Sequence, residues 1–235
     1  MPAYQQYQKA RDAAWKTLIA CRVSSLPVDA KAIAGKLNIA LHSLPEDAPL
    51  LPDGLKAPNA LCFSLRIAGK WHIFIQERQM DDQHVHFAIA HEIGHIILSH
   101  ALRPVSPGVR SLLSQENAGD IIDDPLSPED YFADIFAVRL LAPACVLHAM
   151  QLFSPQQIML SCFLPPKAAK IRAERMHLLS ERKAFLTHPL ERQVYALFLP
   201  DAQNLSPVPC QKRRRLLYLI PALAAAAILI FFLFR

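Results

Sequence analysis

The feature of the sequence that most constrains the fold is a His-Glu-x-x-His motif inside an apolar run. The run extends from Phe87 to Leu98 and carries His91, Glu92 and His95 as its only strongly polar side chains. On a helix, residues four apart lie on one face, so the two imidazoles would point at the same place. Polar groups in a buried helix need partners, and a metal ion would satisfy both histidines at once. The motif therefore predicts a buried helix that carries half of a tetrahedral metal site.

The residue types and their spacing favour zinc and hydrolysis. Zn²⁺ accepts neutral imidazoles as ligands, and a catalytic zinc site keeps one position open for water. Glu92 directly follows the first histidine, where a carboxylate can take a proton from a water molecule at the metal. We therefore expect Zn²⁺ as the cofactor, His91 and His95 as ligands and Glu92 as the catalytic base. The alternative is a chance match, a risk that every short motif carries.

A second helix is predicted to complete the metal site. Ser127 as the cap, Pro128 at the first helical position and acidic residues in the first turn are typical of a helix start. A zinc ion held by two histidines of this kind expects a carboxylate as its third ligand, and the candidates are Glu129 and Asp130. Asp134 lies one turn further on and could support a ligating histidine. The alternative is that these acids only stabilise the helix start through the helix dipole.

The remaining pattern indicates an α+β fold that is rich in helices and carries a small sheet. Strands are predicted at 60–67 and 70–76, after a short extended segment at 39–43. An exposed edge of that hairpin could bind an extended peptide, although an ordinary core hairpin explains the pattern equally well. Segments 45–58 and 103–127 have the composition of loops. Helical or amphipathic spacing is found at 3–23, 28–37, 144–151, 154–163, 166–182 and 184–199.

The distribution of charge gives no support to a nucleic-acid-binding surface. The chain carries 25 basic and 20 acidic residues, a formal net charge of +5. Five of the basic residues are Lys212, Arg213, Arg214, Arg215 and Arg235, whereas every acidic residue lies before residue 202. The rest of the chain is therefore formally neutral, and we expect no direct nucleic-acid binding.

The cysteines indicate a reducing compartment. The chain has five, and no two of them lie two to four residues apart. Such a set suits neither a disulfide framework nor a thiolate zinc site. The first residues also lack the basic and apolar segments of a signal peptide. We therefore expect the body of the protein to lie in the cytoplasm with reduced thiols.

Residues 216–234 are predicted to form one C-terminal transmembrane helix. The stretch contains no charged residue. At ~1.5 Å per residue it would reach roughly 28 Å, close to the ~30 Å hydrocarbon thickness of a bilayer. The basic cluster at 212–215 precedes it directly, and the positive-inside rule keeps that flank in the cytoplasm. The alternative is a buried C-terminal helix, which would need burial on all sides.

Two stretches of the chain form an informative pair. They are Phe87-Ala-Ile-Ala-His-Glu-Ile-Gly-His-Ile-Ile-Leu-Ser-His100 and Asp130-Tyr-Phe-Ala-Asp-Ile-Phe-Ala-Val-Arg-Leu-Leu-Ala-Pro143. Together they resemble the ImmA/IrrE family of zinc metallo-endopeptidases. Segments 25–39 and 164–172 are similar to weaker features of that family, so the resemblance covers roughly residues 23–178. Many peptidase families share the His-Glu-x-x-His motif, but its pairing with the second stretch is much more specific.

The resemblance implies a zincin-like metallopeptidase core and a third metal ligand. In the family, the ligand is usually a Glu four residues before an Asn or Asp of the second helix. That register falls on Asp130, before Asp134. Aspartate is one methylene shorter, so either the helix sits closer or Glu129 takes the role. The resemblance also implies a helix-turn-helix transcriptional repressor as the substrate.

These expectations combine into one organisation of the chain. Residues 1–199 would form an ImmA/IrrE-like metallopeptidase domain, with a core at about 23–147 and a helical part at 148–199. Residues 200–215 would be a linker with the basic juxtamembrane cluster, followed by the membrane helix at 216–234. The predicted function is a membrane-tethered cytoplasmic zinc endopeptidase that takes part in transcription regulation. The alternative is a non-catalytic regulatory binding module at the membrane.

Overall fold

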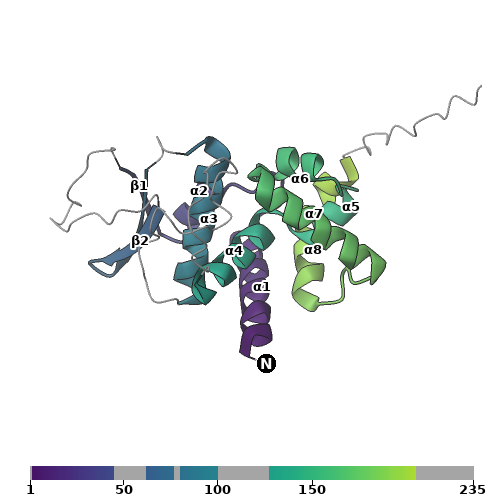
Figure 1. Ribbon diagram of the computed structural model, residues 1–235, viewed down its shortest axis with the longest axis horizontal. Coiled ribbons are helices and arrows are strands. Elements are labelled where there is room, and N and C mark those ends of the chain that lie inside the picture. The colour runs from purple at the N-terminus through teal and green to yellow at the C-terminus, as the bar shows by residue number, and fades with distance from the viewer. Residues whose placement is uncertain (1, 45–61, 77–79, 100–126, 205–235) are drawn as a thin grey trace, which may run out of the picture. The chain divides into compact units, whose positions relative to one another are not determined.

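The computed structural model describes residues 2–44, 62–76, 80–99 and 127–204, which belong to one compact unit, Met1–Asn204 (Figure 1). The predicted membrane helix and the basic cluster before it lie outside the described residues. The same holds for the predicted loop at 45–58 and for nearly all of the loop at 103–127. The membrane anchor and the division of residues 1–199 into a core and a helical part stay predictions.

Helices dominate the described residues, and three short strands form a small mixed sheet, so the predicted helix-rich α+β class is confirmed. The helices are α1 (Pro2–Ala20), α2 (Ala30–Lys36), α3 (Asp82–Leu98), α4 (Pro128–Leu141), α5 (Ala144–Ala149), α6 (Pro155–Cys162), α7 (Pro166–Glu181) and α8 (Pro189–Asn204). The strands are β1 (Ala40–Ser43), β2 (Cys62–Ile67) and β3 (Lys70–Ile75). The last helix runs past residue 199, where the amphipathic pattern ends, to Asn204.

The sheet has the order β1-β3-β2. Strand β1 pairs parallel with β3, and β2 pairs antiparallel with β3 through a hairpin. The hairpin turns at Ala68 and Gly69, which both have positive φ, at 47° and 80°. Positive φ at both central residues is the backbone of a type I′ turn, whose twist matches that of the strands it joins. Within the described residues β3 is the only neighbour of β2, which therefore lies at an edge of the sheet.

The two faces of the sheet carry different sets of apolar side chains because successive residues of a strand point to opposite sides. Cys62, Ile73 and Ile75 join the main core, against which α3 packs. On the other face, Phe63 and Phe74 stack with ring centroids 5.2 Å apart and form a small second cluster. The first face is the one that the motif helix meets.

Helix α3 is the centre of the fold and packs against α4, α1, α2 and the sheet (Figure 1). Its closest helical partner is α4, and Gly94 lies at their contact. A Cβ at Gly94 would come within 3.0 Å of Phe136 Cδ1 and 3.2 Å of the Ala133 carbonyl oxygen. Only glycine lets the two helices approach this closely, and this approach brings the first turn of α4 to the motif histidines.

Among the described residues, the helical stretch Pro128–Ala149 is long and apolar enough to cross a membrane. Its most apolar window is 83% buried inside the protein. Burial of this extent is typical of a core helix, and α4 indeed packs between α1 and α3. This stretch is therefore weak support for a membrane span, and it is distinct from the predicted one at 216–234.

Candidate metal centre

Helix α3 begins at a side-chain cap. Asp81 is the N-cap residue, and its carboxylate accepts a hydrogen bond from the backbone N–H of His84 at 2.9 Å. The ring of His84 also turns back to Asp81, with Nδ1 2.7 Å from Oδ1. His84 and His86 stand before the motif on α3, where His84 is only 6% exposed and His86 is partly buried. The ring of His84 therefore lies against the cap of its own helix.

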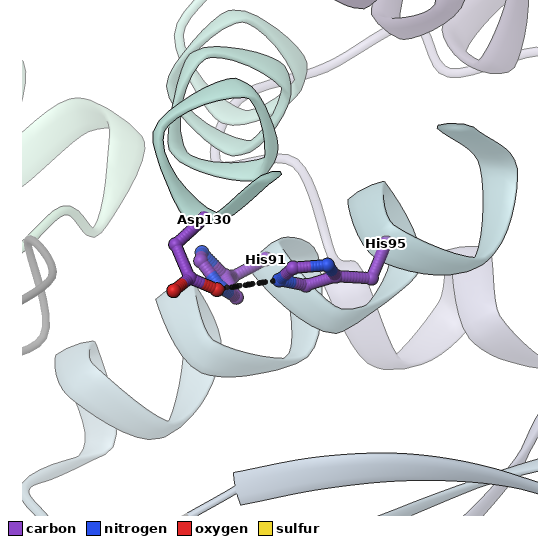
Figure 2. Close-up of side chains that lie close together, drawn as sticks. All are labelled: His91, His95 and Asp130. Atoms are coloured by element: carbon purple, nitrogen blue, oxygen red, sulfur yellow. Dashed lines mark hydrogen bonds and ion pairs between the residues drawn. The ribbon is translucent and has the colours of Figure 1, made fainter. Parts of the chain in front are cut away.

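The structure brings together His91 and His95 of α3 with Asp130 in the first turn of α4 (Figure 2). His95 Nε2 lies 2.9 Å from His91 Nε2 and 3.1 Å from Asp130 Oδ1. His91 Nε2 lies 3.8 Å from the same carboxylate oxygen. Both histidines are buried, and Asp130 is partly buried.

This set of donor atoms could hold a metal ion. One ligand atom from each residue lies within 4.8 Å of the others. Ligands at the corners of a tetrahedron around zinc, at ~2.0–2.1 Å from it, are about 3.3 Å apart. The three observed separations fall on either side of that value. Two imidazoles and one carboxylate are also the donor types that zinc accepts, and three protein ligands leave one position open.

Asp134 contacts His91 at the ring nitrogen that faces away from His95 and Asp130, Nδ1. Its Oδ1 lies 2.8 Å from Nδ1 of His91, and both residues are buried. Asp134 and Asp130 are four residues apart on α4, so one face of this helix presents both carboxylates to α3. A carboxylate at Nδ1 fixes the orientation of the ring and leaves Nε2 directed at the metal position.

The structure distinguishes between the two candidates for the third metal ligand, Glu129 and Asp130. Asp130 contributes to the group of converging donor atoms, whereas Glu129 does not. The other oxygen of Asp130, Oδ2, accepts a hydrogen bond from the Ser127 hydroxyl at 2.8 Å. Ser127 in turn caps α4 by accepting from the backbone N–H of Asp130 at 3.1 Å. The cap that starts the helix therefore also orients the carboxylate.

The carboxylates control the charge of His91 in the metal-free protein. Burial disfavours the charged imidazole, but hydrogen bonds to Asp130 and Asp134 outweigh burial and raise the pKa of His91 to about 10. Burial likewise acts against the charge of Asp130, but hydrogen bonds from His91, His95 and Ser127 hold its pKa well below the usual range. A raised pKa favours the protonated ring of His91, so a metal ion that binds through its Nε2 would have to displace a proton.

Glu92 is buried and faces the sheet. It is 3% exposed, and its Oε2 accepts a hydrogen bond from the Ser64 hydroxyl at 2.7 Å. Its Oε1 has no hydrogen-bond partner among the described residues. Cys62 lies two residues before Ser64, and burial, followed by the charge of Glu92, raises the pKa of its thiol well above the usual value. Sequence reasoning missed Ser64, although a serine between apolar neighbours in a buried strand is a signal of a polar contact.

Tyr131, next to Asp130 on α4, carries a hydroxyl that could donate a hydrogen bond. Its side chain is 52% exposed, and its ring lies edge-on to that of Phe132 at 5.3 Å. These contacts give it no position among the buried groups around His91.

The chain matches no family model, no curated protein and no solved structure. The resemblance to the ImmA/IrrE peptidases therefore rests on motifs and spacing alone, and the family assignment stays a prediction.

Proposed function

We propose that the protein is a zinc-dependent endopeptidase. The observation that carries the proposal is the convergence of His91 and His95 of α3 with Asp130 of α4. Glu92, which is buried, directly follows the first of these histidines on α3. A purely structural metal site would use a fourth protein ligand, whereas the set of three leaves a position for water or substrate.

In this mechanism, His91, His95 and Asp130 would hold the metal ion, and Asp134 keeps the ring of His91 in place. The chemistry that zinc supplies when bound is polarisation of the scissile carbonyl and a lowered pKa of a water molecule. Glu92 takes a proton from this water as the water oxygen forms the new bond to the carbonyl carbon. Glu92 then passes the proton to the leaving amine as the peptide C–N bond breaks.

The edge strand supports a peptide as the substrate. Strand β2 lies next to α3 and has one partner strand among the described residues. An extended peptide can add to such an edge through main-chain hydrogen bonds, which bind without requiring a particular sequence. In keeping with the resemblance to ImmA/IrrE peptidases, the proposed substrate is a helix-turn-helix transcriptional repressor, cut in the cytoplasm by an enzyme tethered through residues 216–234.

A second candidate is a zinc-bearing module that binds a regulator at the membrane without cutting it. Glu92 discriminates between the two. A binding module has no use for a buried carboxylate with one oxygen lacking a partner, because an unsatisfied buried acceptor costs about 1–3 kcal/mol. Oε1 of Glu92 is such an acceptor within the described residues, and this favours the enzyme.

The test compares the full-length protein with Glu92→Gln in detergent. Zinc content is measured by metal analysis, and cleavage is measured on helix-turn-helix repressors encoded near the gene. We expect zinc in both proteins and cleavage by the wild type only, since a general base contributes roughly 10²–10⁴-fold to the rate. Glu174→Gln, an exposed change on α7, serves as the control that keeps activity. Equal cleavage by both proteins, or none by the zinc-loaded wild type, rejects the peptidase.

A further inference from the structure

A buried hydrogen bond joins the edge strand to the motif helix. Ser64 Oγ on β2 donates to Glu92 Oε2 on α3 at 2.7 Å. The two residues are 4% and 3% exposed, and Ser64 is the only buried serine among the described residues. On the same face of the sheet, Ile73 and Ile75 are buried and apolar. Ser64 therefore places a single hydroxyl donor in apolar surroundings, where a hydrogen bond to a charged acceptor is strong.

The hydrogen bond gives the two carboxylate oxygens of Glu92 different surroundings. Oε2 is held by Ser64, whereas Oε1 has no hydrogen-bond partner among the described residues. The last torsion of a glutamate has broad minima, so rotamer preference alone does not fix the plane of this group. A hydrogen bond at one oxygen does fix it, and the other oxygen then has a defined direction.

We propose that Ser64 is a positioning residue for Glu92. It holds the carboxylate plane so that Oε1 remains available for proton transfer, while Ser64 itself touches neither the substrate nor the metal. The proposal rests on the peptidase function proposed above. It adds a role for the edge strand: the strand that would bind the peptide backbone also orients the base that acts on it. The rival explanation is that the hydrogen bond only stabilises the fold.

The kinetic test uses three substitutions of Ser64 in the full-length, zinc-loaded protein. Ser64→Ala removes the hydroxyl, Ser64→Cys keeps the side-chain size with a much weaker donor, and Ser64→Thr keeps the donor. We expect kcat to fall about tenfold in the Ala and Cys variants with KM within about twofold, since misplacing a catalytic group by 1 Å can cost roughly 100-fold. Ser64→Thr should recover most of kcat. Ser43→Ala, an exposed change on β1, should leave kcat and zinc content unchanged.

A second readout does not depend on activity. The melting temperatures of Ser64→Ala, Glu92→Ala and the double variant form a cycle that isolates the pair. We expect Ser64→Ala to lower Tm by roughly 3–8 °C in the wild-type background, because it leaves a buried carboxylate without its donor. In the Glu92→Ala background the same change should have little effect. Ser64→Cys repeats the comparison with nearly conserved volume if the Ala variant folds poorly.

The outcomes are distinct. Non-additive melting temperatures together with a loss of kcat that Thr reverses support the positioning role. Non-additive melting temperatures with unchanged kcat reduce the bond to a structural one and overturn the proposal, and additive melting temperatures overturn it as well. If the zinc-loaded wild type cleaves no repressor, the peptidase function fails and the positioning role fails with it. In that case the cycle still reports whether the hydrogen bond exists.

Discussion

Asp130 completes the group of donor atoms that could hold a metal ion. Its Oδ1 lies 3.1 Å from His95 Nε2, and its Oδ2 is held by Ser127. Glu129, its neighbour, has one more methylene but does not belong to the converging group. The approach of α4 to α3 thus compensates for the shorter side chain, which is one of the two solutions that the sequence left open.

We therefore expect Asp130→Asn and Glu129→Gln to differ in zinc affinity. Loss of a ligand should weaken binding by at least about 100-fold, because even residues that only orient ligands contribute roughly 10–100-fold. Glu129→Gln is the matched control and should bind zinc as the wild type does. Competition with a chromophoric chelator measures both affinities. A larger loss in Glu129→Gln than in Asp130→Asn would contradict this assignment.

Protonation of His91 would make the proposed zinc binding depend on pH. Its pKa is raised to about 10 in the metal-free protein by Asp130 and Asp134, which outweigh burial. In the unfolded chain, the pKa of a histidine is about 6.5. The raised pKa therefore stabilises the metal-free fold fully below pH ~6.5, and this contribution is lost as pH rises through ~10.

Zinc bound through His91 Nε2 would have to displace the same proton. We expect binding to release about one proton at pH 8, and the apparent dissociation constant to fall about tenfold per pH unit between pH ~7 and ~9. Calorimetry in two buffers of different ionisation enthalpy measures the proton release. In Asp134→Asn, which lacks one of the partners that raise the pKa, the release at pH 8 should be smaller. A wild-type affinity that does not change with pH would show that His91 is neutral before the metal binds.

At the scale of the elements, the contact between α3 and α4 brings the ligands together. Gly94 makes that contact close, because an added Cβ would lie 3.0 Å from Phe136 Cδ1 and 3.2 Å from the Ala133 carbonyl oxygen. We expect Gly94→Ala to destabilise the fold by about 1–3 kcal/mol through overpacking. Zinc affinity should fall as well, since α4 carries Asp130 away from the histidines.

The matched control is Gly35→Ala in α2. A Cβ at Gly35 has no atom within 4 Å, and alanine in a helix is favoured over glycine by about 0.8–1 kcal/mol. Denaturant unfolding should therefore rank Gly35→Ala at or above the wild type and Gly94→Ala below it. Equal stability of the two variants would mean that the helices can move apart freely.

The elements could be predicted from the sequence where their signals are local. Asp81 and Ser127 cap α3 and α4 with their own side chains, and apolar periodicity marks the buried faces of both helices. Contacts between distant segments leave no such trace. The hydrogen bond between Ser64 and Glu92 joins residues 28 positions apart. The sequence of neither segment indicates that it contacts the other. The parallel pairing of β1 with β3 was missed for the same reason.

Cation–π contacts that join α1, α4 and α7 are a second example of long-range contacts that the sequence does not predict. The guanidinium of Arg139 lies 4.8 Å from the ring centroid of Tyr7, and that of Arg175 lies 5.9 Å from it. Both arginines also donate to the Tyr7 hydroxyl. Charged residues on a predicted helix are usually assigned to solvent, yet Arg139 is only 8% exposed. Its burial depends on the approach of α1, which periodicity within α4 does not report.

At the scale of the whole molecule, the metal cluster and the predicted anchor at 216–234 lie in separate parts of the chain. An anchor there would hold the domain that carries His91, His95 and Asp130 at the membrane surface. A tether of this kind raises the effective concentration of any substrate held at the same membrane. The full-length protein should therefore cut a membrane-associated repressor faster than a variant that lacks the anchor, although the two share the same cluster.

Deletion of residues 212–235 tests the anchor directly. The uncharged stretch at 216–234 is long enough to span a bilayer, so we expect the full-length protein in the membrane pellet and the deletion variant in the supernatant. Carbonate washing separates insertion from surface attachment, because an inserted helix resists it whereas attraction of 212–215 to acidic lipids does not. Replacing Lys212, Arg213, Arg214 and Arg215 by Gln with the apolar stretch intact is the matched control and should stay in the washed pellet. If the deletion variant pellets like the full-length protein, the membrane attachment lies in residues 1–211 and the anchor is rejected.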